Sequence, residues 1–338
     1  MTATCRDQGA TRSSTTSDSC LTGTKPAFCT FHYNNRTSSS VMPLTRRHFI
    51  GTAASAAALA CKCAAAQVAA EEEHALFWRI EVPDGGRGVM FGYTRVAAAV
   101  VPEVTKDGLR LMESAKRVVL DINNTQLPAM KIDPNLPSLW PKLNPARAGQ
   151  VRAILTSMHV PPAQLENLPG FFIAGLLYAE GQTNPVPSVG GVIVDRAKAL
   201  GRPMTVLLEA SDVEHLRKPV DFARINQSVD GATIEFLLDA RQRVGPIGAY
   251  CERLYRERKG EELQRFAKSM SDHGVPESQT YLDGEAAREM LLARLPTALR
   301  GTQSDDLVFF LLPIGMLSGP KSILTALRDQ GAHTTPLA

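Results

Sequence analysis

The sequence predicts an α/β protein with one mixed central sheet, built from strands at both ends of the body, and a helical insertion in the middle. Segments typical of strands lie within residues 75–122 and again within 307–337. Between them, apolar residues recur mostly at helical spacing. Residues 307–314 are continuously apolar, which is the pattern of a strand buried on both faces. Strands from the two ends are therefore expected to pair in one sheet.

The bulk composition fits one large globular domain preceded by a basic leader. The chain has 338 residues, of which 44% are hydrophobic and 21% are charged. Residues 1–70 hold seven of the 37 Lys and Arg but only two of the 34 Asp and Glu. The remaining 30 basic and 32 acidic residues give the body a net charge of −2. A nearly neutral body gives no electrostatic reason to expect nucleic acid as a partner.

The first part of the body is expected to form a hairpin, a helix and a third strand. Residues 75–82 and 88–92 have strand patterns and are joined by a Pro-Asp-Gly-Gly turn. Residues 104–115 place apolar side chains near helical spacing. Residues 117–122 are typical of a short buried strand, and the Pro- and Asn-rich residues 123–145 are expected to hold no regular element of length.

The middle is expected to be helical apart from one strand. That strand, at residues 203–208, ends at Glu209, and a helix starts near Ser211 in capping-box style. Gly201 is well placed to end the helix before the strand. Helices are expected at residues 146–158, 162–168, 188–200, 220–244 and 247–270, with a strongly apolar segment at 171–180.

The last part of the body returns to the sheet. A helix is expected at residues 284–295, with Pro296 against its far end. The buried strand at 307–314 is followed by a helix at 320–330 and a terminal strand at 332–337. This order of elements completes the single mixed sheet.

Residues 42–70 have the organisation of an export signal. Residues 45–50 read Thr-Arg-Arg-His-Phe-Ile, and an alanine-rich stretch follows. This order resembles the bacterial twin-arginine signal, which exports folded proteins through the Tat machinery. Val68-x-Ala70 fits signal peptidase, so the mature chain is expected to begin at Glu71. The alanine-rich stretch is too weakly apolar to form a stable membrane span.

Other interpretations of the leader remain open. Lipid attachment at Cys61 would produce a lipoprotein, although the residue three positions earlier is smaller than such signals prefer. An amphipathic or buried N-terminal helix is the structural alternative. Residues 1–41 are polar, lack an apolar period and are expected to be disordered. Met42 is an alternative initiator, which would make residues 1–41 a mis-assigned extension.

Two apolar strands of the body each end in a glycine, and this pattern predicts the position of a ligand site. Gly92 ends the second strand, and Gly315 follows the buried strand near the C-terminus. Glycine lets the chain turn sharply and lets a ligand approach the backbone. Ligands of α/β folds bind at this edge of the sheet. The residues three positions after the glycines are Arg95 and Ser318.

These segments resemble the TraB/GumN family, which also contains the TIKI proteases. The resemblance covers residues 74–338 through the order and spacing of several short pieces. The pieces are Leu-Phe-Trp-Arg-Ile-Glu at 76–81, Val-Met-Phe-Gly at 89–92, Val-Val-Leu-Asp at 118–121, Gly191, residues 197–203, Leu-Glu at 208–209, Leu-Leu-Ala-Arg at 291–294, and residues 308–315, Gly319 and 323–332.

The resemblance implies a divalent-metal peptidase site, and this chain departs from it. The family pattern places Gly-x-x-His at both strand ends and an acidic residue after the next strand. Here Arg95 and Ser318 occupy the two histidine positions, and Asp121 stands where glutamate is usual. Glu209 and Arg294 match the pattern, although leucine replaces the asparagine that usually follows the arginine.

The residue types at these positions are poor metal ligands. Arginine stays protonated and cannot bind a metal, and a serine hydroxyl is a weak neutral ligand. The five histidines of the body form no H-E-x-x-H motif and no tight pair, and no G-x-S-x-G motif is present. We therefore predict no cofactor, with a divalent metal expected only if the family site survives in an altered form.

Each candidate residue also has a structural interpretation. These are helix capping for Ser318 and Glu209, backbone hydrogen bonding for Asp121, a buried ion pair of Arg294 with Asp121 or Glu209, and turns for Gly92 and Gly315. The functional interpretation is that Arg95 and Arg294 point into the cleft and bind an anion or carboxylate.

The sequence thus predicts an exported, periplasmic or secreted protein that binds a small anionic or peptide ligand and lacks the family's peptidase activity. One alternative is a divergent hydrolase with Asp121 and Glu209 as general acid and base. Another is a structural protein of the cell envelope. The expected partners of the precursor are the Tat export machinery and signal peptidase.

The export route can be tested directly. Because the twin-arginine pair is the signal's recognition element, we expect Arg46→Lys combined with Arg47→Lys to trap the precursor in the cytoplasm. Fractionation followed by immunoblotting would measure this. Export of the double variant at the normal level would show that the route is different.

Overall fold

The computed structural model describes residues 74–83, 85–122, 136–216, 222–275, 284–300, 306–319 and 321–337. These residues all belong to one compact unit, Ala57–Ala338. The extension at 1–41, the signal at 42–70, Cys61 and the expected cleavage before Glu71 lie outside the described residues, so these predictions stay predictions.

A six-stranded mixed sheet forms the centre of the fold and confirms the predicted fold class. The strands are β1 Phe77–Glu81, β2 Arg87–Tyr93, β3 Arg117–Ile122, β4 Met204–Leu208, β5 Leu307–Pro313 and β6 His333–Leu337, in the spatial order β4-β3-β5-β2-β1-β6. Strands β4, β3, β5 and β2 run parallel, whereas β1 pairs antiparallel with both β2 and β6. The N-terminal hairpin and the terminal strand are therefore where the sequence predicted them.

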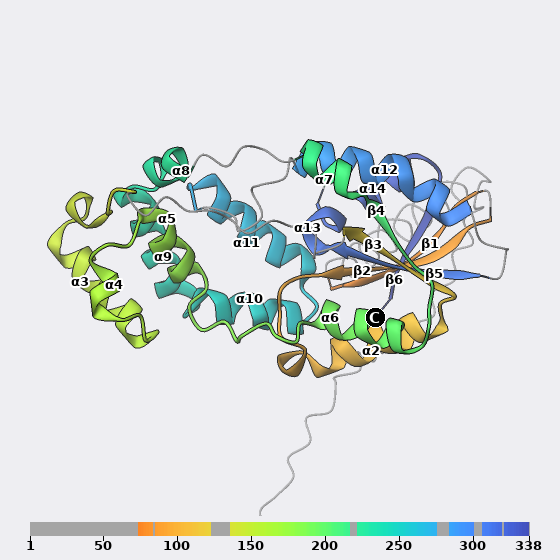
Figure 1. Ribbon diagram of the computed structural model, residues 1–338, viewed down its shortest axis with the longest axis horizontal. Coiled ribbons are helices and arrows are strands. Elements are labelled where there is room, and N and C mark those ends of the chain that lie inside the picture. Colours follow the sequence, from red (N-terminus) through yellow and green to blue (C-terminus); the bar gives the residue numbers. More distant parts are fainter. Residues whose placement is uncertain are drawn as a thin grey trace, which may run out of the picture. The chain divides into compact units, whose positions relative to one another are not determined.

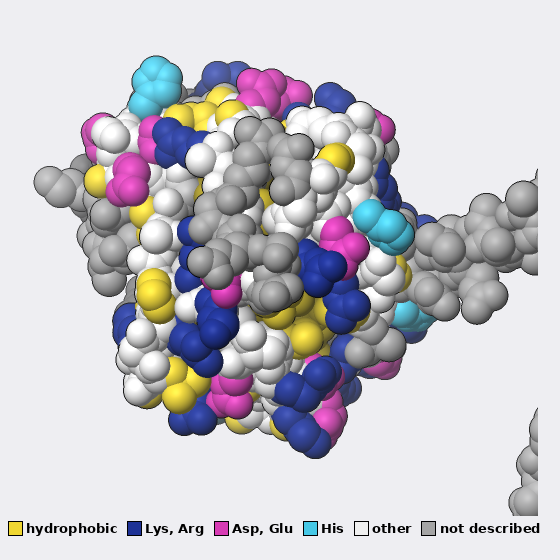
Figure 2. All heavy atoms as spheres, turned by 90° about the vertical axis from the view of Figure 1, so that its right-hand side faces the viewer, with side chains coloured by type: hydrophobic (Ala, Val, Ile, Leu, Met, Phe, Trp, Pro, Cys, Tyr) yellow, Lys and Arg dark blue, Asp and Glu magenta, His cyan; other side chains and the backbone are white. Residues whose placement is uncertain are grey.

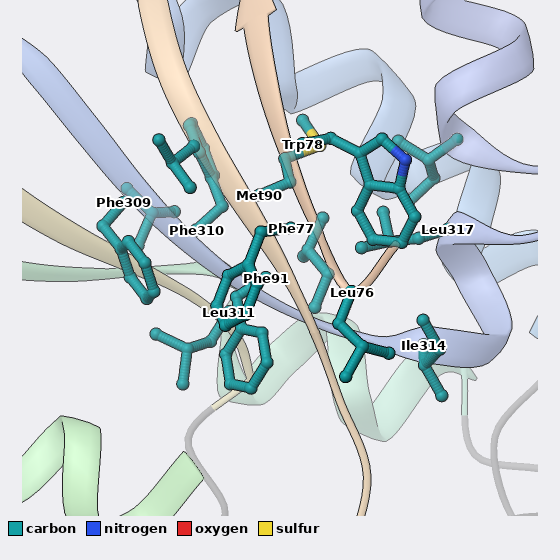
Figure 3. Close-up of a cluster of buried hydrophobic side chains, with 14 of the residues drawn as sticks. Leu76, Phe77, Trp78, Met90, Phe91, Phe309, Phe310, Leu311, Ile314 and Leu317 are labelled. Atoms are coloured by element: carbon teal, nitrogen blue, oxygen red, sulfur yellow. The ribbon is translucent and has the colours of Figure 1, made fainter. Parts of the chain in front are cut away.

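The buried strand β5 lies between β3 and β2, which explains its continuous apolar sequence. Its five central residues are all buried. The aromatic side chains of neighbouring strands pack beside it: the rings of Phe77 and Phe91 stack with centroids 4.5 Å apart, and Phe309 lies 6.3 Å from Phe91. Figure 3 shows these rings in the sheet's hydrophobic cluster, with Trp78 and Leu317 on the other side of the view from Phe309.

Helices cover both faces of the sheet (Figure 1). Helices α2 Pro102–Ser114 and α6 Val189–Ala199 pack together on one face, and α12 Gly284–Arg300 and α14 Ile323–Asp329 pack together on the other. The contact between α2 and α6 is close because Gly108 has no side chain. A Cβ at Gly108 would lie 2.6 Å from Cδ1 of Ile193.

The middle of the chain is helical and contains a second hydrophobic core. Val151, Ile173 and Ile234 are fully buried there, apart from the sheet's cluster. The remaining helical elements of the described chain are η1 Ala98–Val100, η3 Trp140–Lys142, α3 Pro145–Ser157, α4 Pro162–Leu165, α5 Gly170–Tyr178, α7 Ala210–Leu216, α8 Phe222–Ser228, α9 Gly231–Val244, α10 Ile247–Arg256, α11 Gly260–Asp272 and α13 Ile314–Leu317.

Two helices predicted as continuous are each divided in two. The helix expected at 220–244 breaks at Asp230, whose carboxylate accepts a hydrogen bond from the Thr233 backbone N–H at 3.0 Å and so caps α9. The helix expected at 247–270 breaks at Arg258, which has a φ of 62°. Gly260 then begins α11 where a Cβ would lie 3.0 Å from the carbonyl oxygen of Ala75. Apolar periodicity continued across both breaks and concealed them.

The boundaries of two later helices also differ from the prediction. Pro296 does not end its helix but lies inside α12, where Leu291, Leu295 and Leu299 are fully buried on both sides of it. Packing of this apolar stripe offsets the hydrogen bond that proline cannot donate. The helix expected from Pro320 begins at Ile323, with Ser322 as its N-cap.

The described helices include none long and apolar enough to cross a membrane. On the face drawn in Figure 2, basic and acidic side chains are interspersed among the described residues. That face therefore presents no broad region of a single charge.

Candidate functional site

The two glycine-ended strands finish side by side at one edge of the sheet. Strands β2 and β5 pair in parallel, so Gly92 lies opposite Leu312 and Tyr93 lies opposite Pro313. The carboxyl ends of β3 and β4 reach the same edge. The structure thus places the ends of these strands at one edge of the sheet, as their sequence pattern predicts.

Gly92 is committed to internal packing. A Cβ at this position would lie 2.4 Å from Cδ1 of Ile314. Its N–H donates to the carbonyl oxygen of Leu76 at 2.8 Å, and its carbonyl accepts from the hydroxyl of Tyr255 at 3.0 Å. Burial raises the pKa of Tyr255 well above its usual value, so the hydroxyl stays protonated and donates. The strand end requires glycine for packing, and both backbone groups of Gly92 have partners inside the protein.

Gly315 lies in the short helix α13 directly after β5, and it is exposed. A Cβ at Gly315 would lie 3.0 Å from Oε1 of Gln264 in α11. That oxygen is the end of a flexible side chain, so this contact restricts position 315 less than Ile314 restricts position 92.

Arg95 is exposed, and its guanidinium contacts no carboxylate among the described residues. Its carbonyl oxygen accepts a hydrogen bond from the side-chain amide of Gln182 at 2.9 Å. The chain then continues toward α6, where the Val189 N–H donates to the carbonyl of Val96 at 3.0 Å. Arg95 thus lies on the side of the edge that leads to α2 and α6.

Ser318 ends α13 and does not cap the helix that follows. Its backbone N–H donates to the carbonyl of Ile314 at 3.2 Å, whereas Ser322 accepts from Thr325 as the actual N-cap. The predicted capping role of Ser318 is therefore wrong, because the helix starts later than Pro320. The Ser318 hydroxyl is buried and has no hydrogen-bond partner among the described residues. Ser318 is one of the residues that line a small pocket.

The two best-formed pockets of the described chain do not contain Arg95 and Ser318 together. The chain after β2 runs to the α2 and α6 layer, whereas α13 packs against β2, β5, α11 and α14. The pocket beside Ser318 includes neither Arg95 nor Asp121 among its lining residues. The chain segments that follow Arg95 and Ser318 therefore lead to different helical layers.

Asp121 is a buried carboxyl at the end of β3, with 7% of its surface exposed. The hydroxyl of Tyr93 donates to both of its oxygens, at 3.2 and 3.1 Å. Burial raises the pKa of Asp121 from 3.8 to about 6, and the hydrogen bonds from the Ile122 backbone and Tyr93 lower it by less. This carboxyl therefore exchanges its proton near neutral pH, as a general acid or base must.

Arg294 is fully engaged in a structural ion pair. Its guanidinium binds both carboxylate oxygens of Asp212, with Nη2 to Oδ1 at 2.8 Å, and Nη1 also donates to the carbonyl of Leu207. Asp212 in turn accepts from the backbone N–H of Glu209 at 2.7 Å. The predicted ion pair exists, but its partner is Asp212 and not Asp121 or Glu209. This ion pair holds the turn between β4 and α7 against α12.

Glu209 directly precedes α7, and its side chain is exposed. Its carbonyl accepts from the Val213 N–H at 3.0 Å, so its backbone lies at the N-terminus of the helix, and its own N–H donates to Asp212. It lies one residue beyond Leu208, which pairs with Ile122 next to Asp121. The two acidic residues therefore end neighbouring strands, one exposed and one buried.

The residues at the edge do not suit a divalent metal. Arg95 and Ser318 stand three residues after the two glycines, and neither side chain is a good metal ligand. Among the described histidines, His273 stacks on Phe236 with ring centroids 3.7 Å apart. Within the described residues, no group of three His, Cys, Asp or Glu side chains could hold a metal ion. No metal-dependent step is derived from these residues.

No protein-family model matches the chain, and no curated protein or solved structure matches it either. The TraB/GumN resemblance rests on the quoted residues and stays a prediction.

The sequence patterns single out neither Tyr93 nor Asp212 as a residue of this edge. They place Tyr93 in an apolar run and Asp212 at a helix start. A tyrosine directly after a strand-ending glycine was the available signal for the first. Only the packing of α12 against β4 reveals the role of Asp212.

We expect Gly92→Ala to lower the free energy of unfolding by about 1–3 kcal/mol, because the new methyl overlaps Ile314. Ile314→Val removes the obstructing Cδ1, so the double variant should lose less than the sum of the single variants. Denaturant titration measures all four proteins. Gly149→Ala is the control, since no atom lies within 4 Å of its Cβ. Strictly additive losses would contradict the packing role.

The raised pKa of Asp121 predicts a pH-dependent stability. Below its usual pKa of 3.8 the carboxyl is protonated in both states, whereas between that value and about 6 only the unfolded state ionises. Stability is therefore lost as the pH rises through 6. Relative to Asp121→Asn, the wild type should lose up to about 3 kcal/mol of unfolding free energy between about pH 3.5 and about pH 7.5.

Urea titrations at several pH values measure this difference. Asp195→Asn serves as the control, because that carboxyl is exposed on α6. An Asp121→Asn difference that does not change with pH would contradict the burial of a titrating carboxyl.

Proposed function

We propose that this chain is an exported TraB/GumN-like protein that binds a small anionic or peptide ligand at the carboxyl edge of its sheet, without metal-dependent peptidase activity. One observation carries the proposal. The two positions where the family pattern has metal-binding imidazoles hold hydrogen-bond donors, the exposed guanidinium of Arg95 and the buried, unpartnered hydroxyl of Ser318. Such donors suit carboxylate or phosphate oxygens and do not suit a metal cation.

The geometry changes how an anion would be held. Arg294 is engaged by Asp212, so a clamp made of Arg95 and Arg294 is not supported. The remaining candidates for binding an anion at the edge are Arg95 on one side and the pocket of Ser318 on the other. A peptide fits such a divided edge, because it can present a carboxylate and an extended backbone at separate points.

The second candidate is a divergent hydrolase that uses Asp121 and Glu209. The pKa of Asp121, raised to about 6 by burial, favours it. Tyr93 holds that carboxyl, which would store or release a proton, and exposed Glu209 would act on water. No pocket among the best-formed ones of the described chain includes either residue. The binding function is therefore preferred.

The proposed location is the periplasm or the exterior, reached through the twin-arginine leader. The mature protein would then act outside the cytoplasm, and its precursor would meet the Tat machinery and signal peptidase. The support for this location is the leader sequence at residues 42–70.

The proposal predicts the behaviour of protein purified from its own periplasm. We expect less than stoichiometric metal by elemental analysis, no chelator-sensitive cleavage of a broad peptide panel, and a higher Tm with inorganic phosphate or a short acidic peptide. Arg95→Ala should remove most of that Tm increase, because it removes the exposed cation at the edge.

Arg256→Ala is the matched control, an exposed arginine on α10 in the helical middle. It should keep the full response to ligand. Stoichiometric metal together with chelator-sensitive cleavage would overturn the binding function. Cleavage that resists chelators and is lost in Asp121→Asn would favour the hydrolase.

A further inference from the structure

A small pocket lies where α13 meets β1, α11 and α14. Its volume is about 40 Å³, and Trp78, Glu261, Ser318, Ser322, Thr325 and Arg328 are among the residues that line it. Polar groups beside a hydrophobic core are normally hydrogen-bonded, so any unpaired group in this pocket needs an explanation.

The first unusual group is the hydroxyl of Ser318. It is buried, and none of the residues that the structure describes forms a hydrogen bond with it. Nearly all buried polar groups in proteins are hydrogen-bonded, and leaving one unpaired is costly. A rotation about χ1 is enough to redirect a serine hydroxyl. A ligand in the pocket can then accept a hydrogen bond from it.

The second is the indole N–H of Trp78. Only 2% of this side chain is exposed, and it makes no hydrogen bond to a described residue. Indole N–H groups donate and cannot accept. By contrast, the other tryptophan, Trp140, donates to the carbonyl of Leu165 at 2.6 Å. Trp78 lies beside Leu317 at one end of the sheet's cluster (Figure 3).

The hydrogen-bond donors of the pocket indicate whether it would bind an anion or a cation. Arg328 and Glu261 both line it and carry opposite charges, and Nε of Arg328 already donates to the hydroxyl of Thr334. The Ser318 hydroxyl is buried without a partner among the described residues, and the indole N–H of Trp78 makes no hydrogen bond to a described residue. Because an indole N–H can only donate, it favours an anion over a cation, and a serine hydroxyl can donate to the same anion.

The volume limits the size of the ligand. A water molecule needs at least about 10–15 Å³ of such space, so the pocket holds about three atoms of the size of oxygen. A halide ion or a formate-sized carboxylate fits this space. Larger ligands would have to leave most of their atoms outside.

We propose that this pocket binds one small anion, a halide or a formate-sized carboxylate group, through the indole N–H of Trp78 and the hydroxyl of Ser318. The inference rests on the proposed binding function. It specifies which kind of anion would bind beside Ser318. A carboxylate could be a free small acid or the end of a longer ligand that enters the pocket.

Bromide provides a direct test, because it quenches indole fluorescence on contact. In the whole mature protein at constant ionic strength, with sulfate as the balancing anion, bromide should quench the Trp78 fraction of the emission in a saturable manner. Formate should relieve this quenching by competition, and acetate should compete at least about fivefold more weakly because its methyl exceeds the pocket.

Two substitutions separate an anion site from a water-filled void. Ser318→Ala should weaken bromide binding at least about tenfold while leaving the Tm of the ligand-free protein unchanged or higher, because it removes an unpaired hydroxyl. Glu261→Gln should strengthen bromide binding about fivefold, because it removes the opposing charge. Ser157→Ala is the control, since that hydroxyl donates to the carbonyl of Ile154 at 2.6 Å on the distant α3.

The outcomes distinguish the pocket from the broader function. Linear, non-saturating quenching that Ser318→Ala leaves unchanged would overturn the pocket. If phosphate or the acidic peptide still raised the Tm in an Arg95-dependent manner, the binding function would stand without it. Weaker bromide binding in Glu261→Gln would also overturn the proposal, because it would indicate a site that prefers positive charge.

Discussion

The parallel pairing of β2 with β5 is the constraint on which the rest of the structure depends. It joins Arg87 to Leu307 and continues to Tyr93 opposite Pro313, so it links segments 220 positions apart in the chain. Closing so long a loop has an entropic cost that the buried strand must offset. The five buried residues at the centre of β5 and the aromatic rings beside it supply the apolar contacts. Everything between the two strands folds as an insertion within this closure.

Much of the fold could be predicted because the sheet imposes strong patterns on the sequence. A two-sided apolar strand, a hairpin with a Gly-rich turn and a glycine-terminated helix before β4 are local signals, and each corresponds to an observed element. The divided helices show where local patterns fail. Asp230 and Arg258 interrupt segments whose apolar period continues across the break. Pro296 is retained within α12 because tertiary packing outweighs a local penalty.

The edge that carries the candidate site was predictable, but the role of most side chains on it was not. Strand ends are fixed by pattern, whereas hydrogen-bond partners are chosen by packing between distant segments. Arg294 lies 82 positions from Asp212, and Tyr93 lies 28 from Asp121. The local sequence around Arg294 or Tyr93 does not indicate which distant carboxylate each side chain will contact. From the sequence, the glycines are expected to let a ligand approach the backbone. At Gly92 the space left by the missing side chain is occupied by Ile314 instead.

The hydrogen bond from Tyr255 to the carbonyl of Gly92 has a consequence for cooperativity. Tyr255 is fully buried on α10, and α10 packs against α9 and α5 of the helical core. Loss of α10 would leave the Gly92 carbonyl buried without a donor, at a cost of about 1–3 kcal/mol. The ion pair of Arg258 with Asp107 joins the same helical segment to α2. The helical core and the sheet core consist of different residues, but these contacts join them. We therefore expect them to unfold in a single transition.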